Sequence, residues 1–386
     1  MKRIISILTV FTLCICLIIP SFAADAYSAG LKFKSDGTFK IVQVADLQEF
    51  VLSSTITHEF LYDIVVNESP DLFVLSGDNV STMGAAVFPK PIAEQLVKLS
   101  VDNVMKIFDK IYAEFGIPVT MVYGNHDNEV GSYKVSRADQ FAMYAAHPSF
   151  IGYYIPEADE NTSDIFGQHY GTHNLIVNDS TGINPIFNVW MFDSGSYESD
   201  LGYSCVKPSQ IEWFKKTNEE INRLPSVVFQ HIIVKEIDDI LVDDRLPSGA
   251  IGVKRQATGN SNKNYGHYDA LNNSGNVLAM FFGHDHLNNF QIMLDGTDLV
   301  ATACTGFGSY GTLDLRGVRV ITLSESDLTT YDTYNVTYRD YYSLNLLDNT
   351  RVHMFQLLGT LGVFLDRLLF EPITAVADLF EQMFCN

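Results

Sequence analysis

The chain has 386 residues, of which 47% are hydrophobic and 18% are charged. This composition is that of a globular protein and excludes a disordered chain. The formal net charge is −21, and so acidic a surface repels polyanions. We therefore expect no nucleic acid polymer among the partners of the protein.

Residues 1–23 have the pattern of a secretory signal peptide. Two basic residues, Lys2 and Arg3, precede an apolar run from Ile4 to Ile19, and small residues follow with a cleavage site near Ala23. An uncleaved membrane anchor is the alternative, although the apolar run is short for a spanning helix. We expect an exported protein that is either secreted or held at the cell surface or in the periplasm.

Three cysteines would remain after this cleavage, namely Cys205, Cys304 and Cys385. An odd number of widely spaced cysteines is not a disulfide framework. An oxidising compartment would still allow one bridge between two of them.

The first half of the mature chain alternates short strands with helices. Apolar runs with β-branched residues predict buried strands over residues 39–48, 71–78 and 117–127. Helical patterns lie between these runs, over residues 57–69 and 91–116. This alternation predicts an α/β fold with a mostly parallel sheet.

The second half continues this order with less helix. One helix is predicted from Pro208 to about Leu224. Strand-like runs lie over residues 173–179, 186–195, 226–232, 276–286, 290–303 and 318–325. The last two runs are typical of hairpin strands.

Residues 342–386 differ in character from the rest of the chain. They are rich in Leu and Phe, helical in pattern and interrupted by Pro372. Asp366 and Arg367 make the segment a poor membrane-spanning helix. Two interpretations stay open for this helical extension: it packs on the domain, or it contacts a membrane surface or a partner protein.

Polar clusters follow four of the predicted strands at the points where the apolar runs stop. They are Asp46-Leu47-Gln48, Gly77-Asp78-Asn79, Gly124-Asn125-His126-Asp127 and Gly283-His284-Asp285-His286, and a fifth strand holds His231. Ligands of open α/β sheets bind outside the carboxyl ends of the strands, so we expect the clusters to converge. Carboxylates, a carboxamide and imidazoles suit Zn, Mn or Fe, and a carboxylate shared by two cations suits two-metal hydrolysis.

Each cluster also has a purely structural interpretation. Asp46 could cap the helix that follows it, and Asp78 could cap a turn after Gly77. His231 could be a hydrogen-bonded core histidine of an apolar strand. The occurrence of all five clusters at strand ends favours a metal site.

The clusters resemble the motifs of the calcineurin-like metallophosphoesterase superfamily, whose pattern is D-x-H, G-D, G-N-H-D/E, a lone H and G-H-x-H. The likeness extends to the branch of plant purple-acid-phosphatase-like proteins and fungal cell-cycle-regulator phosphatases, through VQVADLQ, GYSCVKPSQIEWF, NYGHYDAL and GHDHLNNF. It covers about residues 38–325. The resemblance implies a four-layer αββα sandwich with mixed sheets, as a phosphoesterase domain over residues 31–341.

The resemblance also implies a site for two metal ions. The ligands would be Asp46 and His286 for the first ion, Asp78 as a bridge, and Asn125, His231 and His284 for the second. His126 would be the general acid that faces the leaving oxygen of the substrate. Asp285 would point away from both ions.

Two residues depart from the pattern of the superfamily. Gln48 stands where a metal-binding histidine is usual, so either its amide oxygen binds weakly or water fills the place. Ser81 stands where the purple enzymes have a tyrosine ligand, so we expect no purple colour. Ser81 also marks the absence of the arginine-containing element of protein serine/threonine phosphatases, which makes that substrate class less favoured.

These residues predict an exported enzyme that hydrolyses phosphomonoesters with two ions of Fe, Mn or Zn. Hydroxide held by the ions would attack phosphorus in line, and His126 would protonate the leaving alkoxide. The substrate would be a small phosphoester or a phosphoprotein, with candidate contacts at Asn79, Lys254, Arg255 and Asn264. Phosphodiesterase or nucleotide hydrolase activity stays open, as does a non-catalytic secreted binding protein that keeps the fold.

Overall fold

The computed structural model describes residues 30–341 apart from 53, 156–167 and 199–201, and also residues 350 and 354. The predicted signal peptide and nearly all of the C-terminal extension lie outside this part of the chain, so both stay predictions, as do the domain boundaries. Within the described ranges, no helix has the length and apolar character that crossing a bilayer requires.

The described strands form two mixed sheets, one of which has five strands in the order β12-β11-β1-β2-β3. Its strands are β1 (Thr38–Val44), β2 (Leu72–Ser76), β3 (Val119–Val122), β11 (Gly317–Ser324) and β12 (Asp327–Thr337). The first three strands pair in parallel, whereas β11 and β12 join them antiparallel.

The other sheet has seven strands in the order β4-β5-β6-β8-β10-β9-β7 among the described residues. Its strands are β4 (His173–Asn178), β5 (Pro185–Phe192), β6 (Ser226–Gln230), β7 (Ile251–Lys254), β8 (Val277–Phe282), β9 (Asn288–Leu294) and β10 (Thr297–Ala301). The inner strands β5, β6, β8 and β10 run parallel, and antiparallel strands flank them.

The sheets bury a core between them because side chains alternate along each strand. In β5, Phe187 and Val189 contribute to the core between the sheets, whereas Trp190 and Phe192 pack toward the helices outside. In β1, Ile41 lies in the same inner core.

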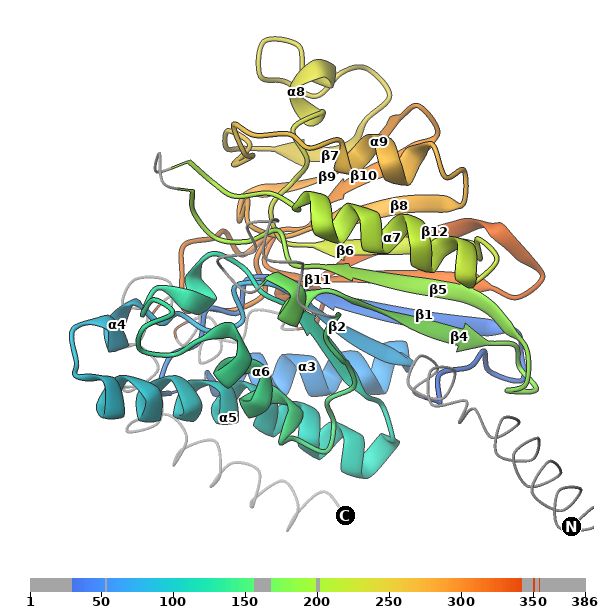
Figure 1. Ribbon diagram of the computed structural model, residues 1–386. Coiled ribbons are helices and arrows are strands. Elements are labelled where there is room, and N and C mark those ends of the chain that lie inside the picture. The colour runs from blue at the N-terminus through green and yellow to red at the C-terminus, as the bar shows by residue number, and fades with distance from the viewer. Residues whose placement is uncertain are drawn as a thin grey trace, which may run out of the picture.

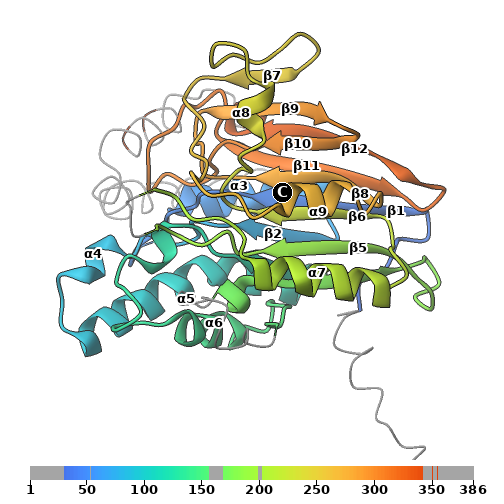
Figure 2. The same ribbon diagram turned by 45° about the horizontal axis from the view of Figure 1, so that its top comes forward.

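Helices cover both outer faces (Figures 1 and 2). The first sheet is covered by α3 (Thr55–Glu68), α5 (Lys90–Phe115) and α6 (Arg137–Ala145), and the second by α7 (Pro208–Glu220) and α9 (His267–Asn272). Short elements complete the described chain: α4 (Met83–Ala86), η1 (His126–Asn128), η2 (Gln168–Gly171), α8 (Ile237–Ile240) and α10 (Tyr338–Tyr341). The layer order is helix, sheet, sheet, helix, which confirms the four-layer αββα sandwich.

The three strands predicted in the first half of the chain pair in parallel, as β1, β2 and β3. Both sheets also carry antiparallel strands, which the alternation did not predict and the resemblance to a family with mixed sheets did. Two of these, β7 and β12, were not predicted at all. Most residues of β12 are exposed or half-buried, and its sequence DLTTYDTYNVT has no continuous apolar side. The short β7 is also largely exposed. Such edge strands lack the apolar periodicity on which strand prediction depends.

The described cysteines carry no bridge. Both Cys205 and Cys304 are free thiols. Cys385 lies outside the described residues, so its state stays open.

Candidate metal centre

Sharp turns follow the parallel strands and bring their polar residues into one place. Asp46 and Asp78, which follow β1 and β2, have positive φ angles of 53° and 51°. Gln48 and His284 also have positive φ, 48° and 70°. Backbone of this kind costs about 1–3 kcal/mol per residue and persists where the surrounding structure holds it, often at functional sites.

Two glycines allow the close approach of these turns. A Cβ atom on Gly124 would lie 2.2 Å from Oδ1 of Asp78, and one on Gly77 would lie 2.5 Å from Nδ1 of His231. Neither space admits a side chain without movement of a neighbouring site residue. The motifs therefore need glycine before their polar residues.

The structural interpretations of the two aspartates were wrong. The N-cap of α3 is Ser54, so Asp46 does not cap that helix. Instead, Oδ2 of Asp46 accepts the backbone N–H of His284 at 2.9 Å. Oδ1 of Asp78 accepts the backbone N–H of His126 at 2.7 Å, from another turn of the site.

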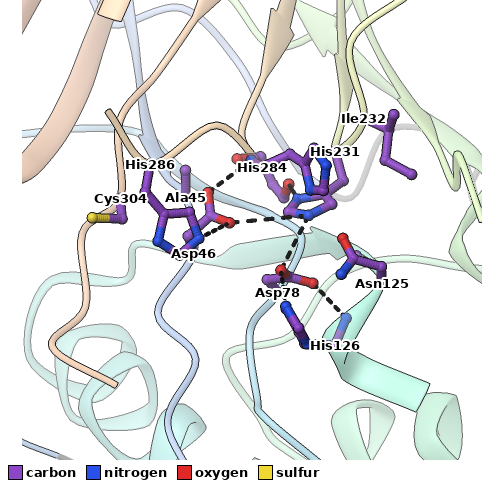
Figure 3. A network of polar contacts seen from close by, with 12 residues as sticks. Ala45, Asp46, Asp78, Asn125, His126, His231, Ile232, His284, His286 and Cys304 are labelled. Carbon is purple, nitrogen blue, oxygen red and sulfur yellow. Dashed lines mark hydrogen bonds and ion pairs between the residues drawn. The ribbon is translucent and has the colours of Figure 1, made fainter. Parts of the chain in front are cut away.

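The side chains form two groups of candidate ligands around these carboxylates (Figure 3). In each group the ligand atoms lie within 4.8 Å of one another: Asp46, Asp78 and His286 form one, and Asp78, His231 and His284 form the other. Asp78 belongs to both groups. His284 and His286 fall into different groups, which is the arrangement that the resemblance implied.

Distances within the groups are short. Nε2 of His286 lies 3.2 Å from Oδ1 of Asp46, and Nε2 of His231 lies 3.3 Å from Oδ2 of Asp78. His231 also lies 4.0 Å from Oδ1 of Asp46. Carboxylates of one sheet and imidazoles of the other therefore meet at the same point.

Three buried polar atoms of the site lack a hydrogen bond of good geometry. Oδ1 of Asn125 is one of them, and the other two, Oδ1 of Asp46 and Nε2 of His231, face only the ion-pair partners given above. A buried unsatisfied polar atom costs about 1–3 kcal/mol, so each such atom needs an explanation. Carboxylate, carboxamide and imidazole atoms are ligands that suit Zn, Mn or Fe. The residues present therefore fit two such cations.

Outer hydrogen bonds orient these ligands toward the centre. Nδ1 of His231 bonds the carbonyl oxygen of Ser76 at 3.0 Å, and Nδ1 of His286 bonds that of Tyr310 at 2.8 Å. Nδ2 of Asn125 donates to the hydroxyl of Tyr197 at 2.9 Å. Each bond leaves the other polar atom of the ligand free for a cation.

Asp285 points away from the centre, as expected. Its carboxylate accepts the N–H of Gly259 at 3.0 Å and the amide of Asn288 at 3.1 Å. Gln48, by contrast, lies inside the centre. Its Nε2 donates to Oδ2 of Asp78 at 2.9 Å and lies 3.3 Å from Nε2 of His286.

The close charges shift several pKa values. Burial lowers the pKa of His231, but Asp78 and Asp46 together raise it to about 9. Burial, reinforced by the positive charge of His231, lowers the pKa of His284 to about 3. Burial raises the pKa of Asp78, yet His231 holds it below its ordinary value. Asp78 is therefore ionised at neutral pH, the state in which a carboxylate binds a cation.

The sequence profile of calcineurin-like phosphoesterases matches residues 39–288, a range that contains every one of these ligands. The chain belongs to the calcineurin-like phosphoesterase family.

Several known proteins are similar to this phosphoesterase chain. An Arabidopsis thaliana protein named "Probable inactive purple acid phosphatase 14" is 28% identical over 360 residues, 82% of this chain and 83% of its own. "Phosphatase DCR2" of Saccharomyces cerevisiae is 24% identical over 310 residues, 74% of this chain and 50% of its own. Among solved structures, a dimetal phosphatase from Danio rerio has a TM-score of 0.46 at 13% identity, with 78% of this chain and 99% of that chain covered.

His126, the predicted general acid of the phosphoesterase, lies at the open edge of the centre. Its side chain is 32% exposed, and its Nε2 lies 3.9 Å from Oδ2 of Asp78. Nδ1 bonds Oε1 of Glu129 at 2.7 Å. Partial burial lowers the pKa of His126, but the bond to Glu129 and the charge of Asp78 raise it above its usual value. His126 is thus placed to hold a proton beside the centre.

The four candidate substrate contacts of the phosphoesterase have other partners in the structure. The amide of Asn79 donates to the carbonyl of Val122 at 2.9 Å, and that of Asn264 donates to Glu236 at 2.7 Å. Lys254 pairs with Asp244, and Arg255 pairs with Asp314 at 2.7 Å. These bonds join none of the four to a member of the ligand set, so their role in substrate binding stays a prediction without support.

The sequence did not indicate three further residues that contact the site of the phosphoesterase. Tyr197 and Tyr310 lie in loops where neither spacing nor composition marks them. Glu129 stands three residues after His126, and a carboxylate at that spacing from a histidine in a turn was the one available signal.

Proposed function

We propose that this chain is a two-metal phosphoesterase that hydrolyses phosphomonoesters. The observation that carries the proposal is that Asp78 belongs to both groups of candidate ligands. The histidines of each group come from the other sheet. A shared carboxylate reduces the repulsion between two cations and holds them at a separation suited to phosphoryl transfer. The name of the yeast relative, a phosphatase, supports monoesters over diesters.

The residues of the chain divide the chemistry among them. When bound, two cations supply the Lewis acid that polarises the phosphoryl group and lowers the pKa of an attacking water. Asp46, Asp78, Asn125 and the three histidines of the ligand set would hold the cations. His126 donates its proton to the leaving oxygen, while Glu129 holds Nδ1 and so directs Nε2 toward the substrate.

A non-catalytic binding protein is the second candidate function. Gln48 favours it, because the centre has a carboxamide where the family usually has an imidazole. The plant relative is also named inactive. Against it stand His126 and its partner Glu129, because a protein without turnover needs no proton donor beside the centre.

The test is hydrolysis by purified protein loaded with Mn, Zn or Fe. We expect turnover of p-nitrophenyl phosphate above that of bis-p-nitrophenyl phosphate. His126→Ala should lower kcat by a factor of about 10²–10⁴, the usual contribution of a general acid. The metal content and the free energy of unfolding of this variant should not change. His147→Ala is the matched control, because His147 bonds Asp109 on α5 and contacts none of the ligands.

Three outcomes would contradict parts of this proposal. An undiminished rate of His126→Ala would remove the general acid. Faster turnover of the diester would reverse the substrate class. Protein that holds no metal and hydrolyses none of these esters or nucleotides would support the binding protein instead.

Export is part of the same proposal, and it is supported by the pattern of residues 1–23. Expression of the full chain in a secreting host should yield extracytoplasmic protein whose mass corresponds to a start near Ala24. Cytoplasmic protein that retains residues 1–23 would contradict export.

A further inference from the structure

A tyrosine ring lies against one histidine of each group of ligands. Tyr203 lies edge-on against His284, with ring centroids 4.4 Å apart and planes at 85°. Tyr197 stacks on Tyr203 at 5.6 Å and 28°. On the side of the other group, Tyr310 stacks on His286 at 4.2 Å and 13°. We call Tyr197, Tyr203 and Tyr310 the aromatic rim.

Two rings of the rim are exposed and the third, Tyr203, is half-buried, although the ligands beside them are buried. Tyr310 is 56% exposed and Tyr197 is 38% exposed, whereas His284 and His286 are 8% and 2% exposed. An apolar ring face held in water next to a polar centre is available to a ligand.

Hydrogen bonds hold the exposed rings in place. The amide of Gln256 donates to the hydroxyl of Tyr310 at 3.2 Å, and the hydroxyl of Tyr197 accepts from Asn125 at 2.9 Å. Rings that are fixed before binding lose little conformational entropy when a planar group stacks on them. The rim is therefore a preorganised surface.

We propose that the aromatic rim binds the planar leaving group of an aryl phosphate or a nucleoside phosphate. The inference rests on the proposed function, because it places the phosphate on the metal centre. His126 lies at the open edge, so the leaving group would extend outward there, where it could reach the exposed rings of Tyr197 and Tyr310. Stacking on a tyrosine ring tolerates any planar substituent, so the rim selects a class of ester rather than one compound.

The test compares adenosine 5′-monophosphate with ribose 5-phosphate. Both esters release the same primary alkoxide, so the ratio of their kcat/KM values isolates the contribution of the base. Tyr310→Leu should lower this ratio at least about fivefold, which is the contribution of one stacked base. Tyr310→Phe, which keeps the ring, should retain the ratio of the wild-type protein.

Tyr334→Leu is the matched control, because Tyr334 is an exposed tyrosine of β12 that bonds Glu68 rather than the metal centre. A second arm measures, in the same variants, the ratio of kcat/KM for O-phosphotyrosine to kcat/KM for O-phosphoserine. If Tyr310→Leu lowers only the ratio for adenosine 5′-monophosphate over ribose 5-phosphate, the rim binds a nucleobase. If it lowers only the ratio for O-phosphotyrosine over O-phosphoserine, the rim binds a phenyl ring. A fall of both ratios identifies planar groups in general.

The inference can fail separately from the proposed function. Calorimetry on the metal-loaded protein gives the dissociation constants of adenosine 5′-monophosphate and ribose 5-phosphate. The ratio of these two constants measures the contribution of the base to binding without turnover. Suppose that neither ester is hydrolysed, but that the protein binds the nucleotide more tightly than ribose 5-phosphate and loses this preference in Tyr310→Leu. The proposed function is then wrong, whereas the binding of planar groups by the rim is confirmed. If the two ratios, in turnover and in binding, are the same for wild-type and Tyr310→Leu protein, the proposed role of the aromatic rim is wrong.

Discussion

Gln48 is the residue that most distinguishes this centre from the usual pattern of its family. Its carboxamide contacts Asp78 and lies beside His286, so the residue occupies the expected place with different chemistry. A neutral amide oxygen is a weaker ligand for Zn or Fe than an imidazole nitrogen. The ion held by Asp46 and His286 should therefore be bound less tightly than its neighbour.

Gln48→His should strengthen that weaker site. We expect one of two metal dissociation constants to fall by about tenfold or more, equivalent to about 1.4 kcal/mol, while the other changes little. Zn titration followed by calorimetry measures both constants. Equal affinities in Gln48→His and wild-type protein would show that position 48 contacts no ion.

Tyr197 is the residue that orients Asn125. Its hydroxyl accepts from Nδ2 of the amide, which leaves the unsatisfied Oδ1 of Asn125 for a cation. Tyr197→Phe should weaken metal binding about 10-fold, the lower end of the effect of losing an outer partner of a ligand. The same titration measures this change, and Tyr334→Phe is its control. Unchanged affinity would mean that the amide holds its orientation without the tyrosine.

At the scale of the elements, a buried ion pair ties α6 to the end of β5. Nε of Arg137 lies 3.6 Å from Oδ2 of Asp193, and the two side chains are 2% and 0% exposed. The guanidinium also lies 4.2 Å above the ring of Tyr123, in the segment that leads from β3 to the metal centre. Removal of one charge from such a pair leaves the other buried without compensation.

Asp193→Asn should therefore destabilise the fold by about 3–5 kcal/mol, because the charge of Arg137 stays buried. The double variant with Arg137→Met should recover most of this loss, since neither charge is then present. Chemical denaturation measures the free energy of unfolding of both variants. A double variant as unstable as Asp193→Asn alone would show that the charge is not the cause.

At the scale of the whole molecule, the metal centre joins the two sheets. Asp46 and Asp78 follow strands of the first sheet, whereas His231 and His284 follow strands of the second. Cations bound by all four side chains would link the sheets at one edge. Binding that occurs only in the folded state stabilises that state.

Removal of metal by a chelator should lower the thermal midpoint, and Mn or Zn should restore it. At a free metal concentration of about 100 times the dissociation constant, the expected stabilisation is about 2.7 kcal/mol. Asp78→Asn is the control, since it weakens both ligand groups and should show a smaller response to metal. Identical melting of chelated and metal-loaded wild-type protein would contradict a cation that links the sheets.

The sequence by itself determined the local features of the chain. Apolar runs located most strands to within a few residues, and Pro91 with Gly116 bounded the long helix, observed over Lys90–Phe115. Residue types at strand ends indicated a metal site. These signals are readable because each depends on neighbours in the chain: periodicity, turn chemistry and the donor atoms of a motif.

Only the tertiary structure decided which distant groups meet. The bond from His284 to Asp46 spans 238 positions of sequence, and no local pattern predicts its geometry. The partners of Lys254 and Arg255, the aromatic rim and the edge strand β12 were likewise not predicted. Their places depend on the packing of the two sheets and of the loops at one edge, so the physical cause lies in long-range contacts.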